Sequence, residues 1–154
     1  MRSAVAGLHF ANSNNRFWRV LHLAGFTARK LEPAEARVLL DYGIGITSAV
    51  TRPTISAAEL TRADYVAARP ALEIKIAKYK PKVLAFLGKS AYSVFTNQRS
   101  LSWGQQSSSF AGSVVWVLPN PSGLNRAFNI SRLTDAYRNL FEAAVLRGRS
   151  FGPQ

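Results

Sequence analysis

The sequence contains no cysteine, and this absence excludes several kinds of site at once. Disulfide bonds, zinc sites built on thiolates, cysteine-ligated iron–sulfur clusters and cysteine nucleophiles all need that residue. Histidine is almost as scarce, since only His9 and His22 are present, which argues against a metal site made of several histidines. A reducing cytoplasm fits this composition, so we expect a cytoplasmic protein.

Carboxylates are also few: the sequence has eight Asp and Glu residues and twenty Lys and Arg residues, so the net charge is +12. The excess is uneven, because no carboxylate occurs between Glu73 and Asp135. That stretch holds the basic residues Lys75, Lys78, Lys80, Lys82, Lys89, Arg99, Arg126 and Arg132. It predicts an anionic partner such as nucleic acid, with a generally solvated basic surface as the alternative. Because carboxylates are scarce, any catalysis should depend on positioning and electrostatics.

Long apolar runs are missing too. No stretch approaches the ~20 continuous apolar residues that span a bilayer, and residues 1–5 lack the apolar core of a secretory signal. We therefore expect no membrane association. With 154 residues, of which 47% are hydrophobic, the chain has the size and composition of one folded domain, and we expect a monomeric domain over residues 1–154.

Apolar periodicity, capping residues and glycines predict an alternation of helices and short strands. Helices are expected over residues 15–24, 34–42, 61–79, 90–96 and 130–145, with another short helix after Ser56. Strands are expected over the apolar runs 44–47, 83–87 and 113–118. This alternation predicts an α/β fold, a three-layer sandwich with helices on both faces of a mostly parallel sheet. Three strands are few for such a sheet.

Two segments imitate nucleotide-binding loops. Gly88-Lys89-Ser90 follows a strand and opens a helix, as a Walker A loop does, but Val83 stands where the first glycine of that motif belongs. The amides after Lys89 could still hold a phosphate group, with a plain strand-to-helix turn as the alternative, so a nucleotide-binding enzyme is one hypothesis. Residues 43–48 imitate a dinucleotide fingerprint, but Ser48 replaces its third glycine and the glycines precede the strand, which excludes that interpretation.

The most informative segment is residues 118–126, Leu-Pro-Asn-Pro-Ser-Gly-Leu-Asn-Arg. It follows the last predicted strand, at the edge where open α/β sheets bind ligands. Two prolines make the loop stiff, and Leu124 stands close to Arg126 on it. An exposed leucine on a rigid basic loop suits a wedge that enters a base stack and fills the space left by an extruded nucleotide. The alternative is that Leu124 folds back into the core.

This loop is one of a series of motifs that run in order along nearly the whole chain. The others are His9-Phe10-Ala11-Asn12, Asn15-Arg16-Phe17-Trp18, Gly43-Ile44-Gly45-Ile46-Thr47, Arg52-Pro53-Thr54, Gly88-Lys89 and Gly104-Gln105-Gln106. Together they resemble the mismatch-specific uracil-DNA glycosylase and thymine-DNA glycosylase family of the uracil-DNA glycosylase superfamily. The resemblance implies the fold of that superfamily and base excision without a metal or cofactor. In that reaction uracil, or thymine from a mismatch, is flipped out of double-stranded DNA with a G:U or G:T pair, and its N-glycosidic bond is hydrolysed.

The resemblance also implies roles for individual residues. Phe10 matches the aromatic residue that stacks on the flipped base, and Ser3 and Asn120 belong to the same base pocket. The wedge and the groups that contact the opposite guanine are matched by four consecutive residues, Gly123, Leu124, Asn125 and Arg126.

Further residues are assigned on weaker similarity. Lys89 and Ser122 are candidates for phosphate contact, whereas Arg16, Phe17 and Trp18 are expected to tie the first helix to the core. Ser48 stands at a position where relatives vary, so it has no assigned role.

One motif of the family is missing from the sequence. Family members carry a strand and then G-I-N-P-G just before the segment that matches Arg2-Ser3-Ala4, and the Asn of this motif positions the hydrolytic water. Met1 stands directly after the place of that motif. We therefore expect a sequence shortened at its start, whose catalytic residue and first strand lie upstream of Met1, in agreement with the shortage of strands. The alternative function is a remnant that binds mismatched DNA without hydrolysing it.

Overall fold

The computed structural model describes residues 15–49 and 60–146, and its internal contacts divide the chain into two units. One unit joins the first segment of the chain to the last, Met1–Ser48 and Asn120–Gln154. The other unit is the continuous segment Ala49–Pro119. The division between the units therefore falls inside the Leu-Pro-Asn-Pro motif, between Pro119 and Asn120.

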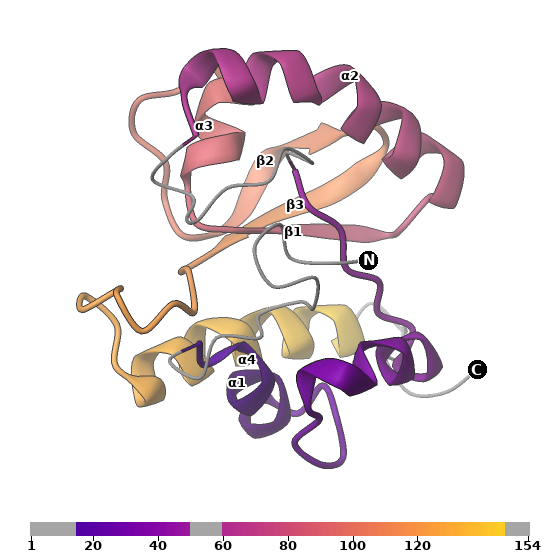
Figure 1. Ribbon diagram of the computed structural model, residues 1–154, viewed down its shortest axis with the longest axis vertical. Coiled ribbons are helices and arrows are strands. Elements are labelled where there is room, and N and C mark those ends of the chain that lie inside the picture. Colours follow the sequence, from indigo (N-terminus) through magenta and orange to yellow (C-terminus); the bar gives the residue numbers. More distant parts are fainter. Residues whose placement is uncertain (1–14, 50–59, 147–154) are drawn as a thin grey trace. The chain divides into compact units, whose positions relative to one another are not determined.

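The Ala49–Pro119 unit contains a three-stranded sheet with the strand order β1-β3-β2 (Figure 1). The strands are β1 (Val83–Leu87), β2 (Gly104–Phe110) and β3 (Ser113–Leu118). β1 runs parallel to the central β3, whereas β2 runs antiparallel to it. The α/β class and the strands at 83–87 and 113–118 are confirmed. The mostly parallel sheet is not confirmed, because one of the two pairings is antiparallel, and the three-layer sandwich is not confirmed either.

β2 is the strand that the sequence analysis failed to predict. Its sequence, Gly-Gln-Gln-Ser-Ser-Ser-Phe, is polar because most of its side chains are exposed at an edge of the described sheet. Ala111 and Gly112 join it to β3, with φ angles of 48° and 90°. A two-residue hairpin loop of this kind favours positive φ at both positions, because its twist then matches that of the strands. The hairpin is therefore what makes the sheet mixed.

Two helices accompany the sheet, α2 (Arg62–Tyr79) and α3 (Ser90–Thr96). α2 begins with a capping box, in which Asp64 N donates to Thr61 Oγ1 at 3.3 Å and Thr61 N donates to the Asp64 carboxylate at 2.8 Å. Thr61 and Ser90 are both residue types that favour the N-cap position, and from the sequence each is predicted to cap its helix. Thr61 does so, whereas Ser90 does not, because Ser90 is the first helical residue and Lys89 holds the N-cap position without a side-chain bond.

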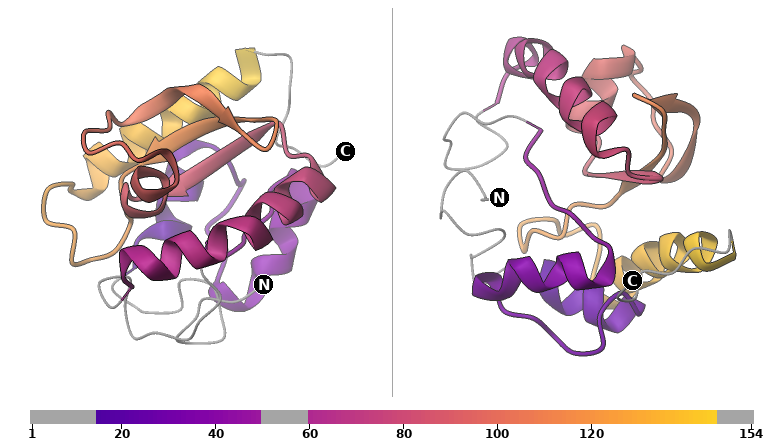
Figure 2. Two further views of the ribbon diagram at one scale, coloured as in Figure 1. Left: turned by 90° about the horizontal axis from the view of Figure 1, so that it is seen from above. Right: turned by 90° about the vertical axis from the view of Figure 1, so that its right-hand side faces the viewer.

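The core of this unit lies between the sheet and these two helices (Figures 1 and 2). It consists of Tyr65, Leu72, Ile76, Phe86, Tyr92, Phe95, Leu101, Phe110, Val115 and Val117. The ring of Phe86 lies 5.2 to 6.0 Å from those of Tyr92, Phe95 and Phe110, in tilted and edge-on arrangements. The burial of Phe86 among these aromatic rings fixes the C-terminal end of β1. Lys89 lies two residues after that end.

The other unit contains α1 (Phe17–Ala24), the 3₁₀ helix η1 (Pro33–Tyr42) and α4 (Ile130–Leu146). Gly25 and Gly43 end α1 and η1 with φ angles of 104° and 75°, which glycine adopts without steric cost. The predicted helix at 34–42 is thus present as a 3₁₀ helix. The strand predicted at 44–47 is wrong, because a strand needs a pairing partner and the described strands pair only among themselves within 83–118. The short helix predicted after Ser56 lies outside the described residues.

α1 packs against α4 and forms the core of this unit. The buried residues of the two helices are Phe17, Trp18, Val20, Leu21 and Ala24 on α1, and Leu133, Thr134, Tyr137, Leu140 and Ala144 on α4. Most of the predicted apolar stripe of α4 is therefore buried, but Val145 is 47% exposed. In the described parts of the chain, no helix combines the length and apolar character that crossing a bilayer requires.

Candidate functional site

The loop of residues 120–129 leads into α4 and is closed by its own hydrogen bonds (Figure 1, orange segment). Asn120 Oδ1 accepts a bond from Ser122 N at 2.9 Å, and Asn125 Nδ2 donates to the Asn120 carbonyl at 2.9 Å. Asn125 N donates to the Ser122 carbonyl at 3.0 Å. The two asparagine side chains thus replace backbone partners inside the turn, which favours one conformation of the loop.

Arg16, the residue before α1, holds this loop from outside. Its Nη1 donates to the Phe128 carbonyl at 2.6 Å, and its Nη2 donates to the carbonyls of Ser122 and Asn125 at 2.7 and 3.2 Å. Its Nε and its backbone N both donate to the Pro121 carbonyl, at 3.3 and 3.0 Å. The planar guanidinium, with five N–H donors in a fixed fork, is suited to several acceptors at once. Arg16 therefore fixes the loop at four carbonyl groups.

Tyr137 of α4 lies near this guanidinium and is fully buried. Burial raises the pKa of its hydroxyl above the usual value, and the charge of Arg16 opposes that rise. The hydroxyl is therefore neutral at physiological pH, so Tyr137 contributes packing and no counter-charge. The positive charge of Arg16 is directed toward carbonyl oxygens of the loop.

The loop has a buried base and an exposed tip. Pro121 is fully buried, whereas Leu124 is 85% exposed and Gly123 and Arg126 are exposed beside it. Leu124 N donates to Ser122 Oγ at 3.1 Å, so the backbone of the exposed leucine is still tied to the loop. The alternative in which Leu124 folds into the core is wrong. A large apolar side chain is presented to solvent by a loop that is fixed at its base.

The entry to α4 adds positive charge close to this tip. Asn129 caps the helix, with its Oδ1 accepting from Arg132 N at 2.8 Å. The Arg132 guanidinium lies 4.8 Å from the centre of the Phe128 ring, and its Nη1 donates to the Ala127 carbonyl at 2.8 Å. Together with the exposed Arg126, this arrangement places two cations on the segment that follows the exposed leucine, as a surface for a polyanion requires.

Lys89 belongs to the Ala49–Pro119 unit, not to the unit that holds the loop tip. It is separated from β1 by Gly88, whose N donates to the Leu118 carbonyl at 2.7 Å and ties the end of β1 to the end of β3. Its Nζ lies 4.4 Å from the centre of the Trp103 ring. The segment joins a strand to a helix, as predicted, and phosphate contact by Lys89 and Ser122 stays a prediction.

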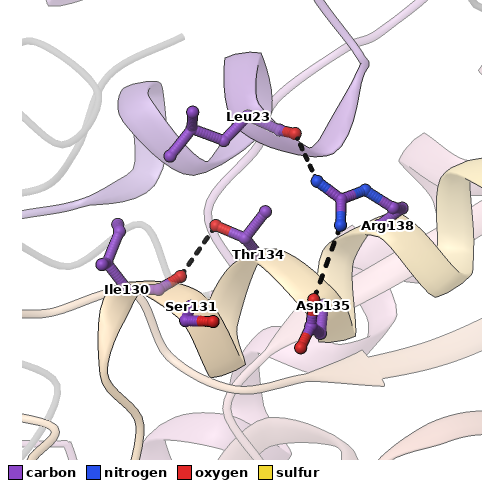
Figure 3. A pocket seen from close by; sticks show the side chains of 6 residues that line it. All are labelled: Leu23, Ile130, Ser131, Thr134, Asp135 and Arg138. Carbon is purple, nitrogen blue, oxygen red and sulfur yellow. Dashed lines mark hydrogen bonds and ion pairs between the residues drawn. The ribbon is translucent and has the colours of Figure 1, made fainter.

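A small hollow of about 200 Å³ lies beside α1 and α4 (Figure 3). Its lining residues are Leu23, Ile130, Ser131, Thr134, Asp135 and Arg138. Arg138 Nη2 donates to the Leu23 carbonyl at 2.9 Å, and Thr134 Oγ1 donates to the Ile130 carbonyl at 2.7 Å. The first bond joins α4 to α1 and the second lies within α4, so the hollow is a feature of helix packing and the candidate site is the 120–129 loop.

Two predicted pocket residues, Ser3 and Phe10, lie outside the described residues. In the described ranges 15–49 and 60–146, no three His, Asp or Glu side chains come together as a metal site. Two relationships were not predicted from the sequence. Arg16 is predicted only to tie the first helix to the core, although it also holds the loop, and Trp103 has no predicted role. No local signal marks the first relationship, because the partners are more than 100 residues apart.

The sequence matches the model of the Uracil DNA glycosylase superfamily over residues 1–143. The match covers both segments that build the candidate site, the one with Arg16 and the one with residues 120–129. The chain belongs to this superfamily, whose members are DNA glycosylases.

Proposed function

We propose that this member of the uracil-DNA glycosylase superfamily removes uracil or thymine opposite guanine in double-stranded DNA, by flipping the base out and hydrolysing its N-glycosidic bond. The observation that carries the proposal is Leu124, which is 85% exposed on a loop that Arg16 and the loop's own hydrogen bonds hold in place. Exposed apolar side chains on rigid basic loops suit insertion into a base stack.

Leu124 acts as the wedge. Its side chain enters the space that the flipped nucleotide leaves. Its contacts with the neighbouring bases replace part of the stacking that is lost when the base is extruded. A flexible loop would lose conformational entropy when the wedge inserts, and this loss would weaken binding. A wedge is therefore most effective when its loop is already rigid. The clamp by Arg16 and the buried Pro121 supply that rigidity before DNA is bound.

The backbone around Leu124 suits the opposite guanine, whose Watson–Crick edge presents N1–H and N2–H donors. The N–H groups of Leu124 and Asn125 already donate to Ser122, and the carbonyls of Ser122 and Asn125 already accept from Arg16. The carbonyl oxygens of Gly123 and Leu124 are therefore the acceptors that we assign to guanine. Adenine presents an acceptor at N1, so this arrangement favours guanine.

The reaction breaks the bond between C1′ of the sugar and the pyrimidine nitrogen. The base leaves with the bonding electrons and the sugar becomes oxocarbenium-like. Water then adds at C1′, and the proton that it loses neutralises the anionic base. A positive field stabilises the departing anionic base. Arg126 and Arg132 supply such a field at the loop, and Ser122 and Lys89 are assigned to DNA phosphates, where the Ser122 hydroxyl proton is available for donation.

Single-turnover release of uracil from a G:U duplex tests the proposal, with an A:U duplex and single-stranded DNA alongside. We expect release from G:U to be faster than from A:U. Leu124→Ala should slow release from the duplex at least about tenfold and leave release from single strands unchanged, because a single strand has no stack to fill.

Leu146→Ala is the matched control, since Leu146 is 86% exposed and lies at the end of α4. Unchanged release from G:U by Leu124→Ala would contradict the wedge. Duplex binding by the wild-type chain without any release would support instead a protein that recognises mismatched DNA without hydrolysing it.

A further inference from the structure

Lys89 does not extend freely into solvent; its ammonium lies over the ring of Trp103, 4.4 Å from the ring centre. This distance is short enough for a strong cation–π contact. The two residues come from different elements, since Lys89 precedes α3 and Trp103 precedes β2. The contact therefore depends on the fold of the Ala49–Pro119 unit.

The backbone on both sides of Trp103 is fixed by one side chain. Gln106 Nε2 donates to the carbonyl of Ser102 at 2.8 Å and to the carbonyl of Gly104 at 3.0 Å. Gly104 has a φ angle of 100°, a conformation that other residues adopt only with strain. The turn that presents Trp103 is thus built by specific residues, and the indole ring is held at a defined place.

Trp103 differs from the two other tryptophans of the chain. Trp18 and Trp116 are 4% and 8% exposed and belong to the core, whereas Trp103 is 40% exposed. Core packing therefore depends less on the indole of Trp103 than on those of Trp18 and Trp116. No carboxylate occurs in the sequence from 74 to 134, so the charge of Lys89 has no acidic neighbour along this segment.

We propose that Trp103 is a positioning residue that holds the Lys89 ammonium in place for a phosphodiester group of DNA. An ammonium has three N–H donors, and an aromatic face occupies only one side of it, so the remaining donors can bind phosphate oxygens. The lysine stem is flexible, and holding it in advance lowers the entropy lost on binding. The inference rests on the proposed function, because it needs the chain to bind DNA.

A double-mutant cycle tests it, with the dissociation constant of a G:U duplex measured at several salt concentrations. Lys89→Met should weaken binding by about threefold to tenfold and lower the salt slope by about one, as the loss of one phosphate contact predicts. Trp103→Leu should weaken binding and lower the slope in the same direction. It should cause no further loss when Lys89→Met is already present.

Trp103→Phe keeps an aromatic face and should retain most of the affinity, which guards against a Leu variant that folds poorly. Lys82→Met is the matched control: it removes the same charge at the opposite end of β1, and it should change the salt slope less than Lys89→Met. The inference, but not the proposed function, would be overturned if the affinity losses of the two single variants multiplied in the double variant. It would also be overturned if Trp103→Leu weakened binding without changing the salt slope. A folded wild-type chain that binds no duplex would overturn the proposed function together with it.

Discussion

Arg16 Nη2 donates to the carbonyl oxygen of Ser122 at 2.7 Å, although the two residues are 106 positions apart in the sequence. Ser122 in turn accepts from Leu124 N through its hydroxyl. The residue that precedes the first helix is thereby connected, through one serine, to the exposed leucine of the loop. The conformation of the proposed wedge depends on the packing of α1 as much as on the loop sequence.

Replacing Arg16 by Lys should loosen the loop, because an ammonium has no planar fork to serve several carbonyls. Hydrogen bonds of charged groups contribute about 1.5–3 kcal/mol each, so we expect the free energy of unfolding to fall by about 2 kcal/mol. Urea denaturation measures this fall, and uracil release from a G:U duplex should slow in parallel. Arg19→Lys, at an exposed position of α1, should change neither quantity; equal effects of both variants would argue against the clamp.

A substitution at Asn120 distinguishes the structural role of this side chain from its role in DNA binding. Asn120→Asp keeps an oxygen that accepts from Ser122 N, so the free energy of unfolding should change by less than about 0.5 kcal/mol. The new negative charge should nevertheless slow excision at least about tenfold, because it opposes the phosphates and the departing anionic base. Single-turnover release at two salt concentrations measures this, and a fully active Asp variant would place Asn120 away from the DNA.

Glu35 gives a pH-dependent contribution to stability. Hydrogen bonds from Arg29 and from Glu32 N hold the pKa of its carboxyl at about 2, below the ordinary value of 4.5. A lowered folded-state pKa stabilises the fold above the unfolded-state pKa, and this contribution is lost as pH falls from about 4.5 toward 2. NMR titration of Glu35 should show the low pKa, and Arg29→Met should raise it toward the ordinary value. A pKa near 4.5 in the wild-type chain would contradict the ion pair.

Thr61 tests the capping box of α2, whose residues have no role assigned toward DNA. Thr61→Ala removes the oxygen that accepts from Asp64 N and should lower the free energy of unfolding by about 1 kcal/mol. Thr61→Ser keeps that oxygen and should recover most of the loss. Thermal and urea unfolding measure both variants. Their affinity for duplex DNA should match that of the wild type, which separates a loss of stability from a loss of binding.

Local patterns in the sequence were sufficient for most of the regular structure. α4 was predicted from its apolar periodicity, and β1 and β3 from short apolar runs bounded by Pro and Gly. β2 could not be predicted in this way, because a polar edge strand has no apolar alternation and depends on the hairpin at Ala111 and Gly112. The run at 44–47 looked like a strand for the opposite reason, since its composition was suitable but it has no partner among the described strands.

By itself, the sequence determined the α/β class, the positive charge between 74 and 134, the exclusion of cysteine chemistry, and the stiff Pro-Asn-Pro loop that carries Leu124. These follow from composition and from neighbours a few residues apart. Only the tertiary structure decided that Leu124 is exposed, that Arg16 holds its loop, and that the Lys89 ammonium lies over the Trp103 ring. The reason is physical: exposure and hydrogen bonding across many residues depend on which surfaces the fold buries and which donors it brings to which carbonyls.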